Sequence, residues 1–555
     1  MTVSEPRIRI IPLGGVGEIG MNMTLLETAE DLLVIDAGLM FPEEEMLGID
    51  LVLPETTYLL ERRDKVRGIL LTHGHEDHTG CLPYLLPQLP VPVYGTRLAL
   101  GLVREKLREF GLAETADLRP VRAGETLRLG GFSIEFVRVA HSIPDGVALA
   151  VETPAGLVVH SGDFKIDRTP VDGAHTDLET FAALGRRGIL LLLSDSTNAV
   201  RDGFTPSESS VGPTFEQLFR AAPRRIIVAC FASNIHRIQQ VLDVAARLGR
   251  KVAVNGRSMT ANTRIAAELG YLRIPPETLV RLDELKRLPP EAGVIVTTGS
   301  QGEPLSAVAR MAVGEHKQIE IERGDTVIFS ARVIPGNEKS IARTINQLLK
   351  RGALVVTEET TPGVHVSGHP AREELAALLA LTRPRNFMPV HGEFRHLYAH
   401  AQLARRAGIP EAQIFLLEDG DVLEMSADAG AVTEKVPAGR VLVDGKGVGD
   451  VGEAVLRDRQ HLAQDGMLIV VLGFDATGAV VAGPELISRG FSLSTGDGDL
   501  FEAARERILG VLAGCSVEEK TDRTLIKQRI HAVLRKQLQK AVDRRPMILP
   551  VIIEV

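Results

Sequence analysis

The sequence predicts a multidomain α/β protein, and three features of the 555-residue chain point to that fold class. Two apolar segments, residues 23–27 and 32–35, read as adjacent strands that begin a sheet. From about Thr205 the pattern changes to helices that alternate with short apolar strands, which is typical of an inserted parallel-sheet domain. A strand pair, helices and a final strand near the C-terminus predict a small α+β domain.

The composition describes a globular protein of several units. A prior of about 150 residues per domain suggests three or four of them. The chain starts without an apolar segment of signal-peptide length, and no apolar run approaches the ~18 residues of a membrane helix, so we expect a cytoplasmic protein without membrane contact. Cys81, Cys230 and Cys515 are too far apart for a disulfide framework or a thiolate zinc site. With a net charge of −9, nucleic acid would have to bind local basic patches.

The residues with the clearest chemistry follow the apolar strand Ile69–Leu71. His73, His75, Asp77 and His78 come within one short loop, which is more than one four-coordinate ion needs. Imidazole and carboxylate without thiolate suit zinc or manganese, and we expect two such ions. The alternative is a solvated loop with chance histidines. The spacing HxHxDH behind a hydrophobic strand favours the metal site.

A glycine-rich segment, Gly15 to Gly20, matches the pattern GxGxxG. A phosphate-binding loop must open a helix, whereas two strands follow this segment, which excludes a dinucleotide site. We interpret the glycines as a hairpin bend that brings the backbone near the metals. Asp36, after the second strand, either orients a ligand histidine or forms a turn before Gly38.

Single ligand-type residues follow three later strands: His141, Asp163 and Asp195. Each is weak alone, because buried histidines and turn aspartates are common. Together with HxHxDH they resemble the metallo-beta-lactamase superfamily, which implies an αββα sandwich. In that resemblance His141 completes the first metal site, Asp163 bridges both metals, and a second site lacks one nitrogen.

The missing nitrogen comes after the inserted domain. His369 precedes a helix and His391 ends a strand. An insertion bracketed by Asp195, His369 and His391 resembles the beta-CASP nucleases, and a histidine at the last position points to RNA rather than DNA. The resemblance thus implies these metal ligands: His73, His75, Asp77, His78, His141, Asp163 and His391.

Six strings together resemble the ribonuclease J family over roughly Arg7 to Glu424: GGVGEIG, LTHGHEDHTG, FASNIHR, SARVIPGNE, HVSGHP and PVHGEFRH. With the patterns above, we expect a metallo-beta-lactamase domain in two parts, a beta-CASP domain between them, a linker with short strands and a small α+β domain. The two parts of the first domain are expected at residues 1–205 and 356–424, and the beta-CASP domain at 206–355. The linker is expected at 425–462 and the α+β domain at 463–555. The family uses the last domain to form dimers or tetramers.

The resemblance also assigns roles to residues. Two divalent ions would activate water and neutralise phosphate charge. His369, oriented by Asp195, is the expected proton donor to the leaving O3′, and Asp77 is counted with the catalytic residues as well. Arg237 and Arg395 are weaker phosphate-binding candidates, because either can be a surface charge. The expected substrate-binding residues are Ser233, Asn234, His365, Val366, Ser367, Gly368, His369 and Arg332.

We therefore expect a ribonuclease of RNA maturation and decay that degrades single-stranded RNA 5′-to-3′, favours a 5′-monophosphate and has weaker endonuclease activity. A small-molecule thioester or lactam hydrolase would not explain the insertion, and an inactive RNA-binding scaffold usually has eroded ligands. The resemblance further suggests a structural Ca²⁺ at Asp50 and Asp444 and membership of an RNA-degradation complex.

Overall fold

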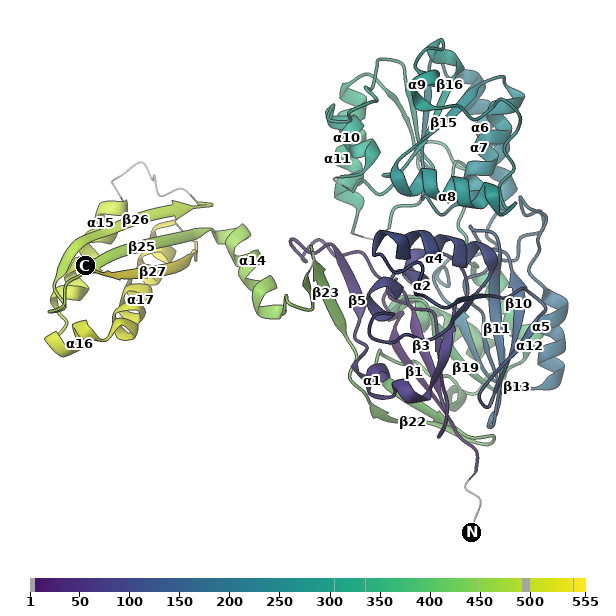
Figure 1. Cartoon of the computed structure of the whole chain (residues 1–555), viewed down its shortest axis with the longest axis horizontal. Coiled ribbons are helices and arrows are strands. Elements are labelled where there is room, and N and C mark those ends of the chain that lie inside the picture. Colours follow the sequence, from purple (N-terminus) through teal and green to yellow (C-terminus); the bar gives the residue numbers. More distant parts are fainter. Residues whose placement is uncertain (1–4, 304, 335, 446, 492–499, 543) are drawn as a thin grey trace. The chain divides into compact units, whose positions relative to one another are not determined.

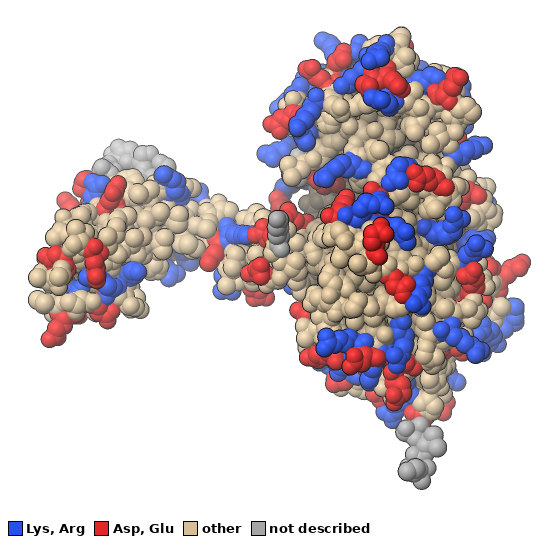
Figure 2. All heavy atoms as spheres, viewed as in Figure 1, with Lys and Arg blue, Asp and Glu red and all other residues tan. Residues whose placement is uncertain are grey.

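The computed structural model describes residues 5–303, 305–334, 336–445, 447–491, 500–542 and 544–555 (Figure 1). The chain forms two compact units. The first contains Met1–Phe41 and Leu51–Val441, and the second contains Pro42–Asp50 and Leu442–Val555. Acidic and basic side chains are interspersed over the face of the molecule seen in Figure 2, in keeping with the modest net charge. None of the described helices is long and apolar enough to span a membrane.

The first unit begins with an eight-stranded sheet in the order β22-β21-β1-β3-β4-β6-β7-β8. The two adjacent strands expected at its start are confirmed, and they pair with Thr24 opposite Ile35. The expected linker begins at residue 425, whereas β22 lies beyond that point and still pairs with β21. The strands are β1 (Ile8–Gly14), β3 (Met23–Glu27), β4 (Leu32–Ile35), β6 (Val66–Leu70), β7 (Val93–Gly95), β8 (Leu118–Pro120), β21 (Asp421–Met425) and β22 (Gly430–Lys435).

A six-stranded sheet in the order β19-β13-β12-β11-β10-β9 forms the other half of the sandwich. The sequence did not predict β11, which pairs antiparallel with both β10 and β12. Because of β11, β10 runs in the same direction as β12, and β13 and β19 are parallel to β12 as well. The C-terminal ends of four strands therefore meet at one edge. The strands are β9 (Thr126–Leu129), β10 (Phe132–Val139), β11 (Gly146–Thr153), β12 (Gly156–His160), β13 (Ile189–Asp195) and β19 (Asn386–Val390).

The main core lies between these two sheets, where Ile10 and Leu33 of the first pack with Phe136, Leu149 and Leu191 of the second. A second cluster covers the outer face of the six-stranded sheet beneath α5 (Leu178–Arg187), α12 (Arg372–Thr382) and α13 (Phe394–Arg406). On the other side α4 (Arg97–Glu109) contacts β7 and β8 (Figure 1). The predicted αββα sandwich is confirmed.

The loop after β6 contains short helices. Two four-residue helices, α2 (Glu76–Thr79) and α3 (Leu82–Leu85), occupy it. A Cβ at Gly80, between them, would lie 2.4 Å from the Leu39 side chain, so the chain needs a glycine where it passes this close.

The inserted domain is a parallel sheet in the order β15-β16-β14-β17-β18 with helices on both faces, as predicted. Its helix α8 packs against α4 of the sandwich. Helix α7 starts after Asn234, whose side chain accepts a hydrogen bond from the Arg237 N–H. The elements are β14 (Ile226–Ala229), β15 (Lys251–Asn255), β16 (Gly293–Thr297), β17 (Thr326–Phe329), β18 (Leu354–Val356), α6 (Val211–Ala221), α7 (Ile235–Arg247), α8 (Arg257–Glu268), α9 (Leu282–Leu285), α10 (Ala307–Val313) and α11 (Glu338–Lys350).

In the second unit, β25 (Met467–Phe474) lies between antiparallel β26 (Val480–Arg489) and parallel β27 (Met547–Glu554). One face of this sheet packs on α15 (Leu500–Ala513) and α17 (Arg523–Val542). Asp522 separates α16 (Val517–Thr521) from α17, and its side chain accepts hydrogen bonds from the next turn. Helix α14 (Glu453–Asp465) occupies part of the expected linker.

Candidate functional site

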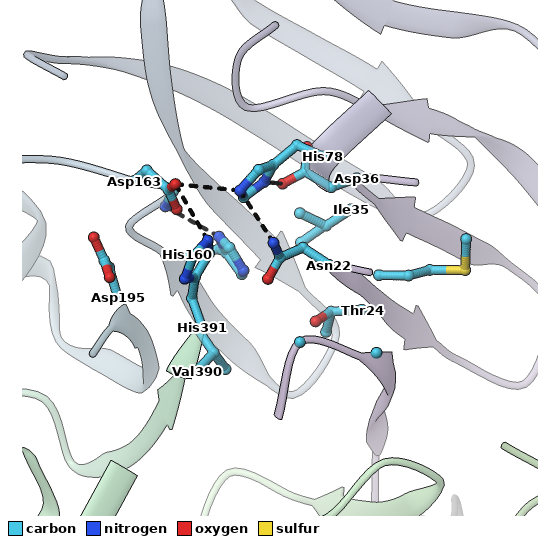
Figure 3. Close-up of a pocket in the computed structure, with 14 residues that line it drawn as sticks. Asn22, Thr24, Ile35, Asp36, His78, His160, Asp163, Asp195, Val390 and His391 are labelled. Atoms are coloured by element: carbon cyan, nitrogen blue, oxygen red, sulfur yellow. Dashed lines mark hydrogen bonds and ion pairs between the residues drawn. The ribbon is translucent and has the colours of Figure 1, made fainter. Parts of the chain in front are cut away.

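The expected site residues lie at the shared edge of the two sheets. His73 to His78 follow β6, His141 follows β10, Asp163 follows β12, and His391 follows β19. In Figure 3 the side chains of His78 and His391 point toward Asp163. The residues that the sequence predicted from widely separated segments are thus brought together.

A first cluster consists of His73, His75 and His141. Nδ1 of His75 lies 2.9 Å from Nε2 of His73 and 3.2 Å from Nε2 of His141. Burial, reinforced by the neighbouring imidazoles, lowers the pKa of His73 and His141 well below 6.5 and that of His75 to about 4. Three neutral imidazoles that face one point form a nitrogen donor set of the kind that binds a divalent metal.

A second cluster combines Asp77, His78, Asp163 and His391. Oδ2 of Asp163 lies 3.2 Å from Nε2 of His78 and 3.4 Å from Nε2 of His391. The same oxygen is 3.7 Å from Nε2 of His73 in the first cluster. It is buried and has no hydrogen bond within the described part of the chain, as expected of an oxygen that completes its contacts with an ion. Its position lets it serve both clusters.

The charges of the second cluster also suit a cation. Burial disfavours charge on His391, but Asp163 and Asp77 outweigh it and raise the pKa of that imidazole to about 9. The same contacts hold the pKa of Asp163 well below its usual range, although burial opposes this. Protonated imidazoles therefore balance the carboxylates, and a divalent ion would take over this role by displacing protons.

Asp36 supports the second cluster. Its Oδ2 lies 2.8 Å from Nδ1 of His78, and its Oδ1 accepts the Thr72 N–H at 2.8 Å. The contact agrees with the first alternative from the sequence, whereas residues 36–39 form no turn, although Asp36 has a left-handed φ of 61°. The contact fixes the ring so that Nε2 of His78 faces Asp163.

Gly368 supports the first cluster in a similar way. Its carbonyl oxygen accepts a hydrogen bond from Nδ1 of His141 at 2.8 Å. A Cβ at Gly368 would lie 2.6 Å from Cε1 of His141, so this close approach requires glycine.

The backbone N–H of His391, whose φ is 55°, donates to the Gly15 carbonyl at 2.8 Å. The glycine-rich segment opens no helix and instead holds a ligand-type histidine, in agreement with the expected bend near the metals.

His369 lies beside the two clusters and contacts Asp195. Its Nδ1 lies 2.8 Å from Oδ2 of Asp195, whose other oxygen accepts the Thr197 N–H at 3.0 Å. Burial disfavours charge on His369, but Asp195 outweighs it and raises the pKa of the imidazole. The side chain is 19% exposed, so a substrate can reach it. His369 also belongs to a possible ligand group with Asp163, Asp195 and His391.

The expected phosphate-binding residues also lie together. Arg237 in the first turn of α7 donates to the Val364 carbonyl at 3.3 Å and lies 3.4 Å from Nδ1 of His365. This places the helix start at Asn234 beside the loop that contains the following expected residues: His365, Val366, Ser367, Gly368 and His369. Arg237 itself is buried against Glu208, and Arg395 is paired with Glu393.

Several polar residues of the site were missed by sequence reasoning. Asn198 is buried and donates to Ser367 Oγ at 2.9 Å and to the His369 carbonyl at 3.1 Å. Asn22 donates to the Asp77 carbonyl at 3.0 Å. The uncharged amide side chains of these residues belong to no metal-binding or acid–base sequence pattern. The only signal was position, since Asn22 follows the glycine-rich segment and Asn198 follows Asp195.

Asp50 and Asp444, the expected calcium ligands, both lie in the second unit. Oδ2 of Asp50 accepts the Gly445 N–H at 2.8 Å, and Asp444 forms an ion pair with Arg459. Neither residue belongs to a possible metal-binding group among the described residues.

The chain matches four known domain families in order. Residues 16–225 match the metallo-beta-lactamase superfamily, and residues 223–348 match the ribonuclease J beta-CASP domain. Residues 360–414 match the Zn-dependent metallo-hydrolase RNA specificity domain, and residues 454–555 match the ribonuclease J C-terminal domain.

Relatives that match almost the whole chain are also named as ribonucleases J. Ribonuclease J2 of Bacillus subtilis is 43% identical over 549 residues, which cover 99% of each chain. Ribonuclease J of Thermus thermophilus is 44% identical over 557 residues, covering 99% of this chain and 96% of that one. A crystal structure of a protein of unknown function from Enterococcus faecalis shares the fold, with a TM-score of 0.54 at 16% identity over 76% of this chain and 100% of that one. The chain therefore belongs to the ribonuclease J family and is a metal-dependent ribonuclease.

Proposed function

We propose that this ribonuclease trims RNA from a 5′-monophosphate end one nucleotide at a time and cuts single-stranded regions internally at a lower rate. It would act in the cytoplasm in RNA maturation and decay. The observation that carries this proposal is the direct connection between the metal-type clusters and a candidate phosphate pocket, through Gly368.

The pocket would be formed by the start of α7 and the loop that ends at His369. The free N–H groups of a helix start favour an anion. The Arg237 contacts with Val364 and His365 support its assembly from two segments, and the Gly368 contact with His141 supports a pocket next to the proposed metal sites. A terminal phosphate in the pocket would leave the next phosphodiester at the metals, whereas a triphosphate would be too large and too highly charged.

For the metals, we propose zinc or manganese at two sites. His73, His75 and His141 would hold the first ion, Asp77, His78 and His391 the second, and Asp163 would bridge them. When bound, such ions activate water and stabilise negative charge on the phosphate. Asp77, close to this reaction centre, would act as a ligand and thereby as a catalytic group.

His369 would deliver a proton to the leaving O3′. Asp195 orients the ring through Nδ1, which leaves Nε2 for the substrate. The raised pKa of His369 keeps a proton available near neutral pH. Binding of substrate phosphates would use Ser233, Asn234, His365, Val366, Ser367, Gly368 and Arg332.

Identical single-stranded RNAs with a 5′-monophosphate, 5′-triphosphate or 5′-hydroxyl test the proposal. We expect single-nucleotide products to appear fastest from the 5′-monophosphate RNA, with products sized over time from a 3′ label. Equal rates on all three, or shortening from the 3′ end, would contradict the pocket while leaving the metal-dependent ribonuclease intact.

We also propose the domain limits 1–205, 206–355, 356–424, 425–462 and 463–555. The pairing of β22 supports moving the third limit from residue 424 to Lys435. Assembly into a dimer or tetramer through the last domain, and membership of an RNA-degradation complex, follow from the family resemblance. A calcium site at Asp50 and Asp444 stays a prediction, and the Asp444–Arg459 ion pair argues against it.

A further inference from the structure

Two arginines from different domains form hydrogen bonds with one buried asparagine, Asn198. Arg332, in the loop after β17 of the inserted domain, donates from Nη1 to Oδ1 of Asn198 at 2.9 Å. Arg201, in the loop after β13 of the sandwich, donates its backbone N–H to the Asn198 carbonyl at 2.8 Å. The Asn198 side chain thus holds the guanidinium of Arg332, and the Asn198 carbonyl holds the backbone of Arg201.

The same asparagine contacts the loop that ends at His369. Nδ2 of Asn198 donates to Ser367 Oγ at 2.9 Å and to the carbonyl of His369 at 3.1 Å. Asn198 is 1% exposed, whereas both arginines are exposed residues. The guanidinium of Arg332 is therefore held beside the loop that ends at His369, and the charge of Arg201 is near enough to act on it.

Neither guanidinium forms a direct ion pair with a residue that the structure describes. Among the described residues, no carboxylate lies within ion-pair distance of Arg201 or Arg332, in contrast to Arg237 and Arg395 with their glutamates. Burial lowers the pKa of both side chains, and the charge of Arg201 lowers that of Arg332 further. Glu358 attracts Arg201 from beyond ion-pair distance, and its carboxylate accepts the backbone N–H groups of Gly363 and His365.

Partly desolvated like charges without a counter-ion cost free energy, and an anion removes that cost. Guanidinium groups match phosphate oxygens in a bidentate way. We infer that Arg201 and Arg332 together clamp one internal backbone phosphate of single-stranded RNA beside His369. This rests on the proposed function, in which RNA enters this site, but it concerns a phosphate other than the terminal one.

The test uses the full chain and a short single-stranded RNA with 2′-O-methyl phosphorothioate linkages that resist cleavage. Binding is measured by fluorescence anisotropy over a series of salt concentrations. Arg201→Ala is the cleanest variant, because its side chain has no hydrogen bond to the described residues. We expect about 10-fold weaker binding and a slope of log affinity against log salt that is smaller by up to about 0.7, the value for one phosphate on a single strand.

A double-mutant cycle distinguishes one shared phosphate from two separate contacts. If both arginines hold the same phosphate, Arg201→Ala with Arg332→Ala weakens binding by clearly less than the product of the single effects. Arg186→Ala, a solvent-exposed arginine at the end of α5, is the matched control and should bind like the unchanged protein. Melting temperatures verify that each variant is folded.

The 5′ end separates this inference from the proposed function. If the clamp holds an internal phosphate, Arg201→Ala loses the same amount of affinity for RNA with a 5′-monophosphate as for RNA with a 5′-hydroxyl. A loss confined to the 5′-phosphorylated RNA, or unchanged affinity and salt slope in a folded Arg201→Ala variant, overturns the clamp. Absence of 5′-monophosphate preference in the cleavage assay contradicts only the proposed terminal pocket, since the binding test does not depend on it.

Discussion

Asp163 is the residue on which the site depends most. One oxygen of its carboxylate lies within 3.9 Å of five imidazoles, those of His73, His78, His141, His369 and His391. A buried carboxylate in such surroundings is costly unless positive charge accompanies it. The protein thus holds a negative charge at the one point from which both histidine clusters can be reached.

Removal of this charge tests the metal site. We expect Asp163→Asn to lose bound metal and to cleave RNA more slowly by on the order of 10²-fold or more, because the oxygen proposed to bridge the ions loses its charge. Metal content by mass spectrometry and cleavage of labelled RNA measure the two effects. Asp117→Asn, at an exposed carboxylate paired with Arg119, is the control. A variant of Asp163 that kept both metal and rate would show that the cluster is not the reaction centre.

His369 allows chemistry to be separated from metal binding. Its imidazole contacts Asp195, so His369→Ala should retain metal and RNA affinity while cleavage slows by about 10²–10⁴-fold, the usual effect of losing a general acid. Metal analysis, RNA binding and single-turnover cleavage are measured on the same preparation. Loss of metal together with rate would instead make His369 a ligand, as its proximity to Asp163 and His391 allows.

At the scale of elements, the glycine-rich segment acts as a support for the strand end that carries His391. β2 (Val16–Gly17) pairs in parallel with β20 (Gly392–Glu393), directly after that histidine. The next residue, Glu18, is anchored by Arg440 at 3.0 Å. Burial, and then the charge of Glu18, raise the pKa of Asp419 to about 8.

The Asp419 carboxyl predicts how stability depends on pH. In the folded protein it keeps its proton up to about pH 8, whereas in an unfolded chain it loses the proton near pH 4. The folded state binds the extra proton between these values, so the free energy of unfolding falls as pH rises from about 4 to 8. Asp419→Asn should reduce this fall and raise the melting temperature at pH 8 more than at pH 5. Denaturation scans at both values measure it, and an identical pH dependence in the variant would rule out Asp419 as the cause.

At the scale of the whole molecule, the second unit exposes apolar residues on one face of its sheet. Leu468, Val470 and Leu472 of β25 face the helices, so the alternate residues face the other way. On β27 the register pairs Leu549 with Ile469, and Leu549 is 48% exposed. An apolar sheet face of this kind supports assembly of copies of the chain.

In the proposed assembly through this domain, we expect Leu549→Asp to dissociate the copies while leaving the fold of the unit intact. A charge on the open face cannot be buried without a partner. Light scattering after size-exclusion chromatography measures the mass, and Val517→Asp, at an exposed residue of α16, is the control. An unchanged mass for Leu549→Asp would mean that copies associate elsewhere or not at all.

The sequence by itself determined the fold class, the family and the main candidates for the metal site. The strands at 23–27 and 32–35 and the inserted parallel sheet were predictable, because burial of apolar residues imposes a local periodicity. HxHxDH was predictable because its ligands come from one loop. His391 was found through family resemblance, since no local pattern connects it to Asp77.

The tertiary structure decided which distant groups meet. β11 was missed, although it sets the direction of β10 relative to β12 and thereby brings His141 and Asp163 to one edge. The roles of Asn198 and Gly368 depend on approaches between segments far apart in sequence, at distances that composition and periodicity do not encode. Local patterns reflect burial within one element, whereas the contacts of the site arise from the packing of several elements, which is a property of the folded chain alone.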